Sequence, residues 1–235
     1  MKNLKFVVSC IICFLFVNSF LYADNIIENL QNKRNTLNTQ GITYSVSVDN
    51  EDKGTSTEKC IITEKGKNKF FEKINSLQKI MYLLCDDGKL YQIYTLQEPS
   101  VFYSLKAVIL PEEIKKDILK QYDYEIPDYS ECIVGDKVTV NGYNCQIITK
   151  IVTKTIKENE QNFTTRQNIT RMYVSERYGY PTRIEYLYKN SYSNSPDCDE
   201  GFSKATVNFI KFTTDLTNKL TELPEKAFVT DYKKN

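Results

Sequence analysis

The sequence predicts an α+β protein, mainly β, built on a single highly curved antiparallel sheet. Three observations lead to this prediction. Apolar and polar residues alternate with period 2 through much of the chain after residue 41. Asp-Gly and Asn-Gly pairs between apolar runs, at residues 86–88 and 141–142, are typical of tight hairpins. Only residues 24–38 and 99–122 resemble helical segments, and these are expected to cover the concave face of the sheet.

The elements of the first half follow from these patterns. Residues 24–38 place their apolar side chains near one stripe of a helix, and residues 42–48 then alternate as a strand. Extended segments are expected at residues 60–74, 79–85 and 90–95. Residues 80–84 are continuously apolar, which predicts a strand covered on both faces.

The predicted helical insert, residues 99–122, contains Pro111-Glu112-Glu113, which is typical of a helix start. Strands are expected to resume at residues 138–140, 143–151, 151–156, 168–174, 180–186 and 205–213. Residues 216–223 are expected to form a linker or turn, and residues 224–229 to close the fold. The prediction amounts to about nine to eleven strands.

The N-terminus has the layout of a secretory signal peptide over residues 1–23: a basic start, an apolar stretch from Phe6 to Phe20, and Ala23 at the expected cut. Cleavage would leave residues 24–235 as a single periplasmic domain that is not an integral membrane protein. A retained N-terminal anchor, a lipoprotein modified at Cys10 and a shifted cleavage site stay open as alternatives.

The amino-acid composition excludes several classes of function. The 235 residues include 31 Lys plus Arg, 30 Asp plus Glu, and no His. Without His, neither Ser-His or Cys-His catalytic pairs nor His-ligated metals can form. The near-zero net charge argues against nucleic-acid binding. Because the acidic pairs at 86–87 and 112–113 fit turn and helix-start positions, we predict no catalytic residue, metal or cofactor.

Five cysteines lie beyond the signal peptide: Cys60, Cys85, Cys132, Cys145 and Cys198. Export permits disulfides, so one or two bridges and a leftover thiol are expected, with the connectivity open. Acidic residues flank Cys198 at positions 197–200 and could bind a hard cation. We expect instead that this segment is a solvated loop.

Several stretches resemble the periplasmic outer-membrane lipoprotein carrier superfamily (LolA/LolB-like). Residues 178–185, Tyr-Gly-Tyr-Pro-Thr-Arg-Ile-Glu, resemble its late strand pair. Residues 207–216 resemble the closing strand of that family, and Leu223-Pro224 resembles the proline-containing segment that follows it. The N-terminal helix, and the hairpin that leads into Tyr91-Gln92-Ile93-Tyr94, resemble the first elements of the family's fold. These segments follow one another in the family's order over nearly the whole chain after the signal peptide.

The resemblance implies an open β half-barrel covered by helices, which holds acyl chains in a hydrophobic cavity. We therefore expect a non-enzymatic carrier whose partner is a lipid or an acylated lipoprotein. The alternative is an envelope sensor or interaction module with the same fold, a filled core and a protein partner. Alternation suggests which side chains would form the cavity and its lid: Ile27, Leu30, Tyr44, Val46, Leu83, Ile93, Tyr94, Val101, Phe102, Leu105, Val108, Ile109, Ile114 and Ile118.

Overall fold

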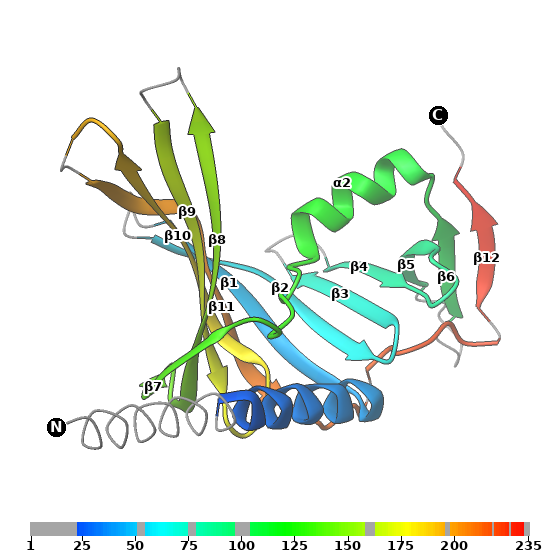
Figure 1. Ribbon diagram of the computed structural model, residues 1–235. Coiled ribbons are helices and arrows are strands. Elements are labelled where there is room, and N and C mark those ends of the chain that lie inside the picture. Colours follow the sequence, from blue (N-terminus) through cyan, green and yellow to red (C-terminus); the bar gives the residue numbers. More distant parts are fainter. Residues whose placement is uncertain are drawn as a thin grey trace, which may run out of the picture. The chain divides into compact units, whose positions relative to one another are not determined.

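The fold is seen in a computed structural model that describes residues 23–50, 55–74, 79–96, 104–157, 163–195, 198–217, 219–225 and 227–232. The described strands form one twelve-stranded sheet in the order β12-β6-β5-β4-β3-β2-β1-β11-β10-β9-β8-β7 (Figure 1). The sheet is not closed, because its end strands β12 and β7 have no neighbour on their outer sides in that order. This confirms the predicted mainly β fold with a single open sheet.

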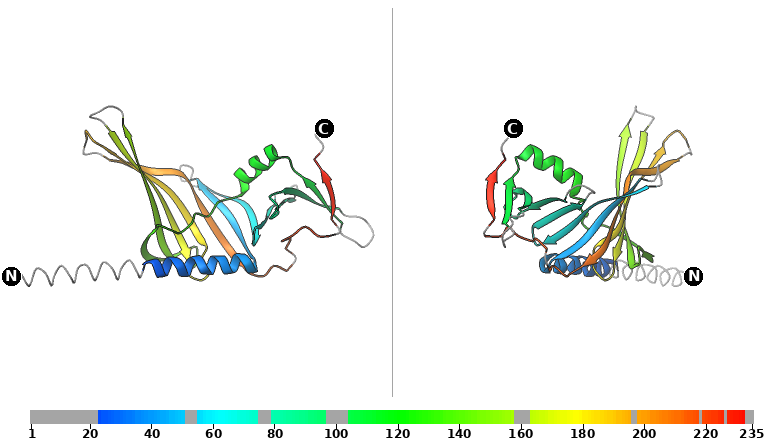
Figure 2. Two further views of the ribbon diagram at one scale, coloured as in Figure 1. Left: turned by 45° about the vertical axis from the view of Figure 1, so that its right-hand side comes forward. Right: turned by 180° about the vertical axis from the view of Figure 1, so that it is seen from behind.

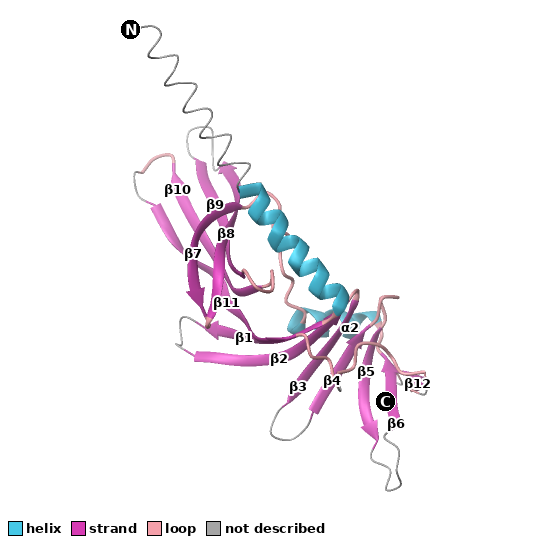
Figure 3. Ribbon diagram, turned by 90° about the horizontal axis from the view of Figure 1, so that it is seen from below, coloured by secondary structure: helices cyan, strands magenta, loops and turns pink. Residues whose placement is uncertain are grey.

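Backbone contacts divide the chain into two compact units. The first consists of Met1–Arg34 and Asp128–Lys204, and the second of Asn35–Pro127 and Ala205–Asn235. The first unit contains β7 (Ile133–Val140), β8 (Tyr143–Lys157), β9 (Phe163–Ser175), β10 (Pro181–Tyr192) and the start of β11 (Cys198–Thr213). Strands and two helical stretches are distinguished by colour in Figure 3. Neither described helix combines the length and the apolar character needed to cross a membrane.

The second unit contains α2 (Glu112–Tyr122) and the remaining strands. These are β1 (Ile42–Asn50), β2 (Thr55–Lys65), β3 (Asn68–Ile74), β4 (Lys79–Leu84), β5 (Leu90–Leu96), β6 (Ser104–Ile109), the end of β11 and β12 (Phe228–Asp231). Twelve described strands exceed the nine to eleven expected.

The N-terminal helix, residues 23–40, is confirmed, and its first part belongs to the first unit. Leu30 is buried, and the Arg34 guanidinium carbon lies 5.4 Å and 5.8 Å from the ring centroids of Tyr129 and Tyr180. Tyr129 donates a hydrogen bond of 2.7 Å to the carbonyl of Gly179, in the turn between β9 and β10. The helix is therefore held against that turn by apolar and cation–π contacts.

In the second unit, the strand register separates two faces of the sheet, because directly opposed residues point to the same side. What we call the α2 face carries Tyr44, Ile62, Phe71, Tyr82, Gln92 and Val108, which oppose one another across β1 to β6. What we call the C-terminal face carries Thr63, Phe70, Leu83, Tyr91 and Ile109 in the same way. Tyr122 packs 6.0 Å from Tyr82, which places α2 on the first face (Figure 2).

The predicted helical insert at residues 99–122 is only partly right. The described part before Leu110 is the strand β6, and the helix is limited to α2. Residues 105, 107 and 109 alternate onto one face while β5 and the parallel β12 supply backbone partners on both sides. Helix starts only after Pro111, whose backbone is extended.

The single extended segment expected at residues 60–74 is likewise wrong. It is a hairpin of β2 and β3, joined by a turn at Gly66-Lys67. Gly66 has a φ of 62°, a left-handed conformation that glycine adopts without steric cost. Gly66, which stands between two lysines, is the feature of the sequence that indicates this turn.

A network of charged and hydroxyl groups connects this hairpin to both helical stretches. Glu64 is buried, and its carboxylate accepts a hydrogen bond of 2.8 Å from Tyr44 and one of 3.3 Å from Asn38. Lys69 lies 3.5 Å from Glu64 and 2.7 Å from Asp123, the residue that caps α2. Burial would lower the pKa of Lys69, but the two carboxylates raise it above its ordinary value of 10.5.

Replacing Lys69 by Met should lower the free energy of unfolding by about 2 kcal/mol, because two carboxylates would lose their shared cation. The expected loss of stability is moderate because the side chains of Lys69 and Asp123 are 28% and 25% exposed, so solvent screens their attraction. Lys65→Met, on an exposed neighbour, should cost less than about 0.5 kcal/mol. Urea unfolding measures both. A raised pKa means that the Lys69 contribution is present at neutral pH and lost at alkaline pH, so the difference from wild type should shrink above pH 10.5.

Gly179→Ala should destabilise the first unit. Gly179 has a φ of 68°, and a Cβ there would lie 2.7 Å from the amide nitrogen of Arg34 and closer still to the carbonyl oxygen of Leu30. We expect a loss of about 2–3 kcal/mol on thermal or urea unfolding. Gly142→Ala is the control, because Gly142 has a φ of 80° but nothing within 4 Å. Its strain alone should cost about 1 kcal/mol; equal losses would contradict the proposed crowding.

Candidate functional site

The cavity residues expected from the sequence are split between the two faces of the second unit. Tyr44 and Val46 lie on the α2 face, as does Tyr94 two residues along β5 from Gln92. Leu83 and Ile93 lie on the C-terminal face instead. One cavity on one side of this sheet cannot be lined by both groups. Ile27 and Leu30 belong to the first unit, and Val101 and Phe102 fall outside the described residues.

The C-terminal face is packed and closed. Its core consists of Phe70, Met81, Leu83, Tyr91, Ile93 and Ala107, and the chain after β11 covers it with Leu220 and Leu223. Leu105 and Ile109, expected in the lid, pack against this same core from β6. The alternation that suggested a cavity lining here is the alternation of a filled core.

The α2 face is filled near β1. Tyr44 and Val46 are almost completely buried, and the rings of Phe209 and Phe212 each lie 5.7 Å from the Tyr44 ring. Val46 is directly opposite Phe209 in the register. These contacts are those of a close-packed core, so the predicted cavity does not extend to β1.

Toward β4 to β6 the α2 face is only half covered. Ile80, Tyr82, Leu84 and Val108 are half-buried, and Tyr94 is 42% exposed. Their neighbours on the other face, such as Leu83 and Ile93, are 0% and 3% exposed. The amphipathic helix α2 lies over this surface with Ile118 and Tyr122 buried and Ile114 half-buried. An apolar surface under a single helix is therefore available on this side.

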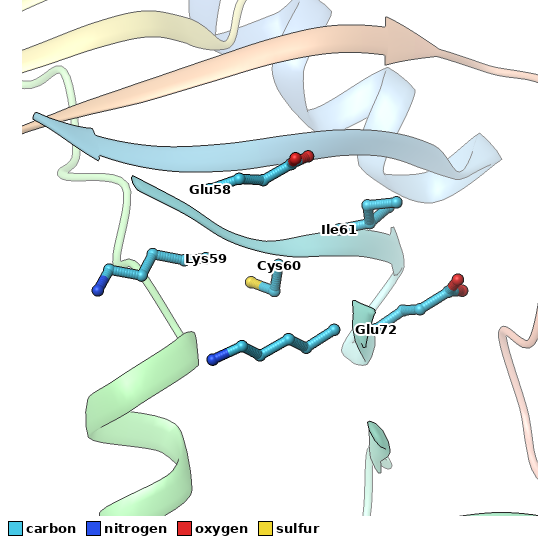
Figure 4. Close-up of a pocket in the computed structure, with 6 residues that line it drawn as sticks. Glu58, Lys59, Cys60, Ile61 and Glu72 are labelled. Carbon is cyan, nitrogen blue, oxygen red and sulfur yellow. The ribbon is translucent and has the colours of Figure 1, made fainter. Parts of the chain in front are cut away.

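A cavity of about 200 Å³ lies beside the C-terminal end of α2, lined by Glu58, Lys59, Cys60, Ile61, Glu72 and Lys73 (Figure 4). The Cys60 sulfur lies 3.8 Å from the carbonyl oxygen of Tyr122, which places it against the helix end. In Figure 4 the side chains of Lys59 and Cys60 extend toward the helix end, while the carboxylates of Glu58 and Glu72 extend away from it.

The carboxylates of the cavity are already paired. Glu72 is buried and holds Lys79 at 3.1 Å and Lys219 at 4.0 Å, while Glu58 lies 3.8 Å from Lys211. Among the described residues, neither Lys59 nor Lys73 lies within ion-pair distance of a carboxylate. Lys73 instead sits 5.7 Å from the centroid of the Tyr122 ring. Lys59 and Lys73 are thus the charged side chains of the cavity lining that have no oppositely charged partner among the described ion pairs.

Cys60 is not suited to nucleophilic chemistry. Burial raises the pKa of its thiol to about 12, although nearby Lys73 partly opposes the shift. Burial also raises the pKa of Tyr124 to about 12, with further contributions from Cys60 and Tyr122. Both groups are therefore protonated at neutral pH, and the thiolate needed for attack is absent.

The disulfides expected from the sequence are not formed, since all five cysteines are free thiols. In the register, Cys145 opposes Val138 and Ser175, and Cys60 opposes Val46. A disulfide needs two cysteines with Cα atoms about 4.4–6.8 Å apart, typically on adjacent elements. Each of these two strand cysteines instead has a non-cysteine neighbour.

Sequence reasoning missed Lys59 in the cavity lining and the tyrosines Tyr122 and Tyr124 near Cys60. Lys73 follows Lys69 and Phe71 at period 2, so it falls on the α2 face once the β2–β3 turn is placed at Gly66. Tyr122 and Tyr124 carry no comparable signal, because they follow the helix rather than a strand pattern. No protein-family model matches the chain, and no curated protein is similar enough to count as a relative.

The cysteines should differ sharply in reactivity. Cys198 is exposed, whereas Cys60 and Cys145 are buried. With a pKa of about 12, Cys60 has on the order of one thiolate in ten thousand at pH 8. Maleimide labelling read by peptide mass spectrometry should modify Cys198 first and leave Cys60 unmodified until urea unfolds the chain. Rapid labelling of native Cys60, or resistance of any of the five to labelling after unfolding without a reductant, would contradict this assignment.

Proposed function

We propose that the protein is a non-catalytic carrier or binding protein for an amphiphile with an acyl chain and an anionic head group. A free fatty acid or the acyl part of a lipoprotein has this chemistry. The ligand would lie between α2 and the sheet, with its head group at Lys59 and Lys73. The half-covered apolar surface beneath α2 is the observation that carries the proposal. Export to the periplasm through residues 1–23 is part of the same proposal.

The energetics favour a ligand of mixed character. Each buried CH₂ group would contribute about 0.8 kcal/mol, so an acyl chain supplies most of the binding free energy. An anionic head group would gain charge-assisted hydrogen bonds from lysines that have no carboxylate partner among the described ion pairs. The acyl chain would cover side chains such as Tyr82, Tyr94 and Val108 that α2 leaves partly exposed.

Entry of a long chain would require α2 to move. The cavity of about 200 Å³ is smaller than the roughly 300 Å³ at which small-molecule sites begin. Only Ile118 and Tyr122 of α2 are buried, and just Leu110 and Pro111 join the helix to β6. We therefore propose α2, with Ile114 and Ile118 facing the ligand, as the lid. The strand residues Leu105 and Ile109 are not part of it.

A second candidate is an envelope interaction module that binds protein through its surface. The packing of Phe209 and Phe212 around Tyr44 favours it, because that part of the sheet has a filled core. The two candidates differ in whether a small amphiphile binds under α2.

The test compares Lys73→Gln with Lys116→Gln in the full chain, purified after export. Lys116 is an exposed residue of α2 and serves as the matched control. Displacement of a fluorescent fatty acid measures affinity for palmitate and for the uncharged alcohol of the same length. Lys73→Gln should weaken palmitate binding about tenfold and leave alcohol binding unchanged, while Lys116→Gln changes neither.

Native mass spectrometry of the wild-type protein should also show a bound acylated mass that organic solvent removes. A bare protein that binds neither probe would overturn the carrier proposal and leave the interaction module. Equal effects of Lys73→Gln on palmitate and the alcohol would overturn the assignment of the head-group site.

A further inference from the structure

The strand β8 continues well beyond its neighbour β7. The pairing with β7 ends at Ile133 opposite Thr149, whereas the pairing with β9 runs on to Lys157 opposite Phe163. Within the described chain, residues 150–157 therefore have a strand partner on one side only, and residues 151–157 are all exposed (Figures 1 and 2). Their outward N–H and C=O groups form an open sheet edge.

This edge carries lysines, which disfavour pairing with another cationic strand, but it has no structural feature that would block an added strand. From Cys145 to Lys157 the register with β9 is regular, without a bulge, glycine or proline. The adjacent edge strand β7 differs, because it contains Gly135 and a register shift between Val134 and Lys137. Residues 150–157, Lys-Ile-Val-Thr-Lys-Thr-Ile-Lys, are rich in β-branched residues that favour an extended chain.

The charges on the edge have one sign. Lys150, Val152, Lys154 and Ile156 share one face, so cations alternate with aliphatic side chains. Lys154 directly opposes Arg166 on β9, a like-charge pair that destabilises a sheet. Arg166 is held 5.3 Å over the Tyr188 ring. None of the described ion pairs includes Lys150, Lys154 or Lys157.

We infer that residues 150–157 form a docking edge that takes up an extended acidic segment of a partner protein as an additional β-strand. Main-chain hydrogen bonds would supply affinity, and side chains alternating between carboxylate and aliphatic would match the alternation of β8. A second copy of this strand fits poorly, because residues 150–157 carry three lysines and no acidic residue, so pairing two copies would bring cations together without a carboxylate to compensate them. An acidic partner relieves the repulsion at Lys154 instead.

The test uses the full chain and a capped octapeptide complementary to the edge, Glu-Val-Thr-Glu-Thr-Val-Ile-Glu. Fluorescence anisotropy measures its affinity, and a peptide with Lys in place of each Glu is the charge control. We expect binding of the acidic peptide, weakened about tenfold by Lys154→Glu. Lys189→Glu is the matched variant, because it reverses a charge on β10, which is paired on both sides. It should change affinity by less than about twofold.

Two N-methylated peptides separate strand addition from simple charge attraction. One is methylated at its odd positions and the other at its even positions. Because successive N–H groups of a strand point to opposite sides, only one of the two can still donate to β8. We expect one to bind and the other to fail. Equal binding of both, no binding of the acidic peptide, or equal effects of Lys154→Glu and Lys189→Glu would each overturn the inference. None of these outcomes depends on the amphiphile site.

Discussion

The position of α2 depends on one lysine held between two carboxylates. Lys69 reaches Asp123, which caps the helix, and Glu64, which lies on the sheet. Glu64 is in turn hydrogen-bonded to Tyr44 on β1 and to Asn38 at the end of the N-terminal helix. A buried carboxylate is tolerated only when its partners compensate for lost hydration, so these groups must be assembled together. The network therefore fixes the C-terminal end of the helix, and with it the wall of the cavity at Tyr122.

The rest of α2 is held far less strongly. Its carbonyl at Leu119 is satisfied by the cap at Asp123, but its exposed first turn has only the pair of Lys115 with Glu112. An exposed pair of this kind contributes little to stability. The helix is thus held through the residues that flank it, Asp123 at one end and buried Leu110 at the other, above an apolar surface that it only half covers.

The sequence predicted the sheet better than the site, for a physical reason. Period-2 alternation shows which residues of one strand share a face, and it correctly predicted strands around Tyr44, Leu83 and Ile93. It does not show which faces of neighbouring strands lie on the same side of the sheet, because that depends on turn lengths and register. Lys69 and Glu64 look like solvent-facing charges in the sequence, and only the Gly66 turn brings them together beside Asp123. The apolar run before Pro111 was compatible with helix or strand, and β5 and β12 decided it by pairing.

The near-neutral composition conceals how unevenly the charges are used. The chain has 31 bases and 30 acids, yet Glu72 holds two lysines and Glu185 holds two arginines. The pairing is thus uneven, and Lys59, Lys73 and Lys154 have no carboxylate among the described ion pairs, even though acids and bases are nearly equal in number. Net charge governs long-range attraction to a polyanion, which is why it argues against nucleic acid. Short-range recognition depends on local pairing, and both the amphiphile site and the docking edge are proposed where pairing is incomplete.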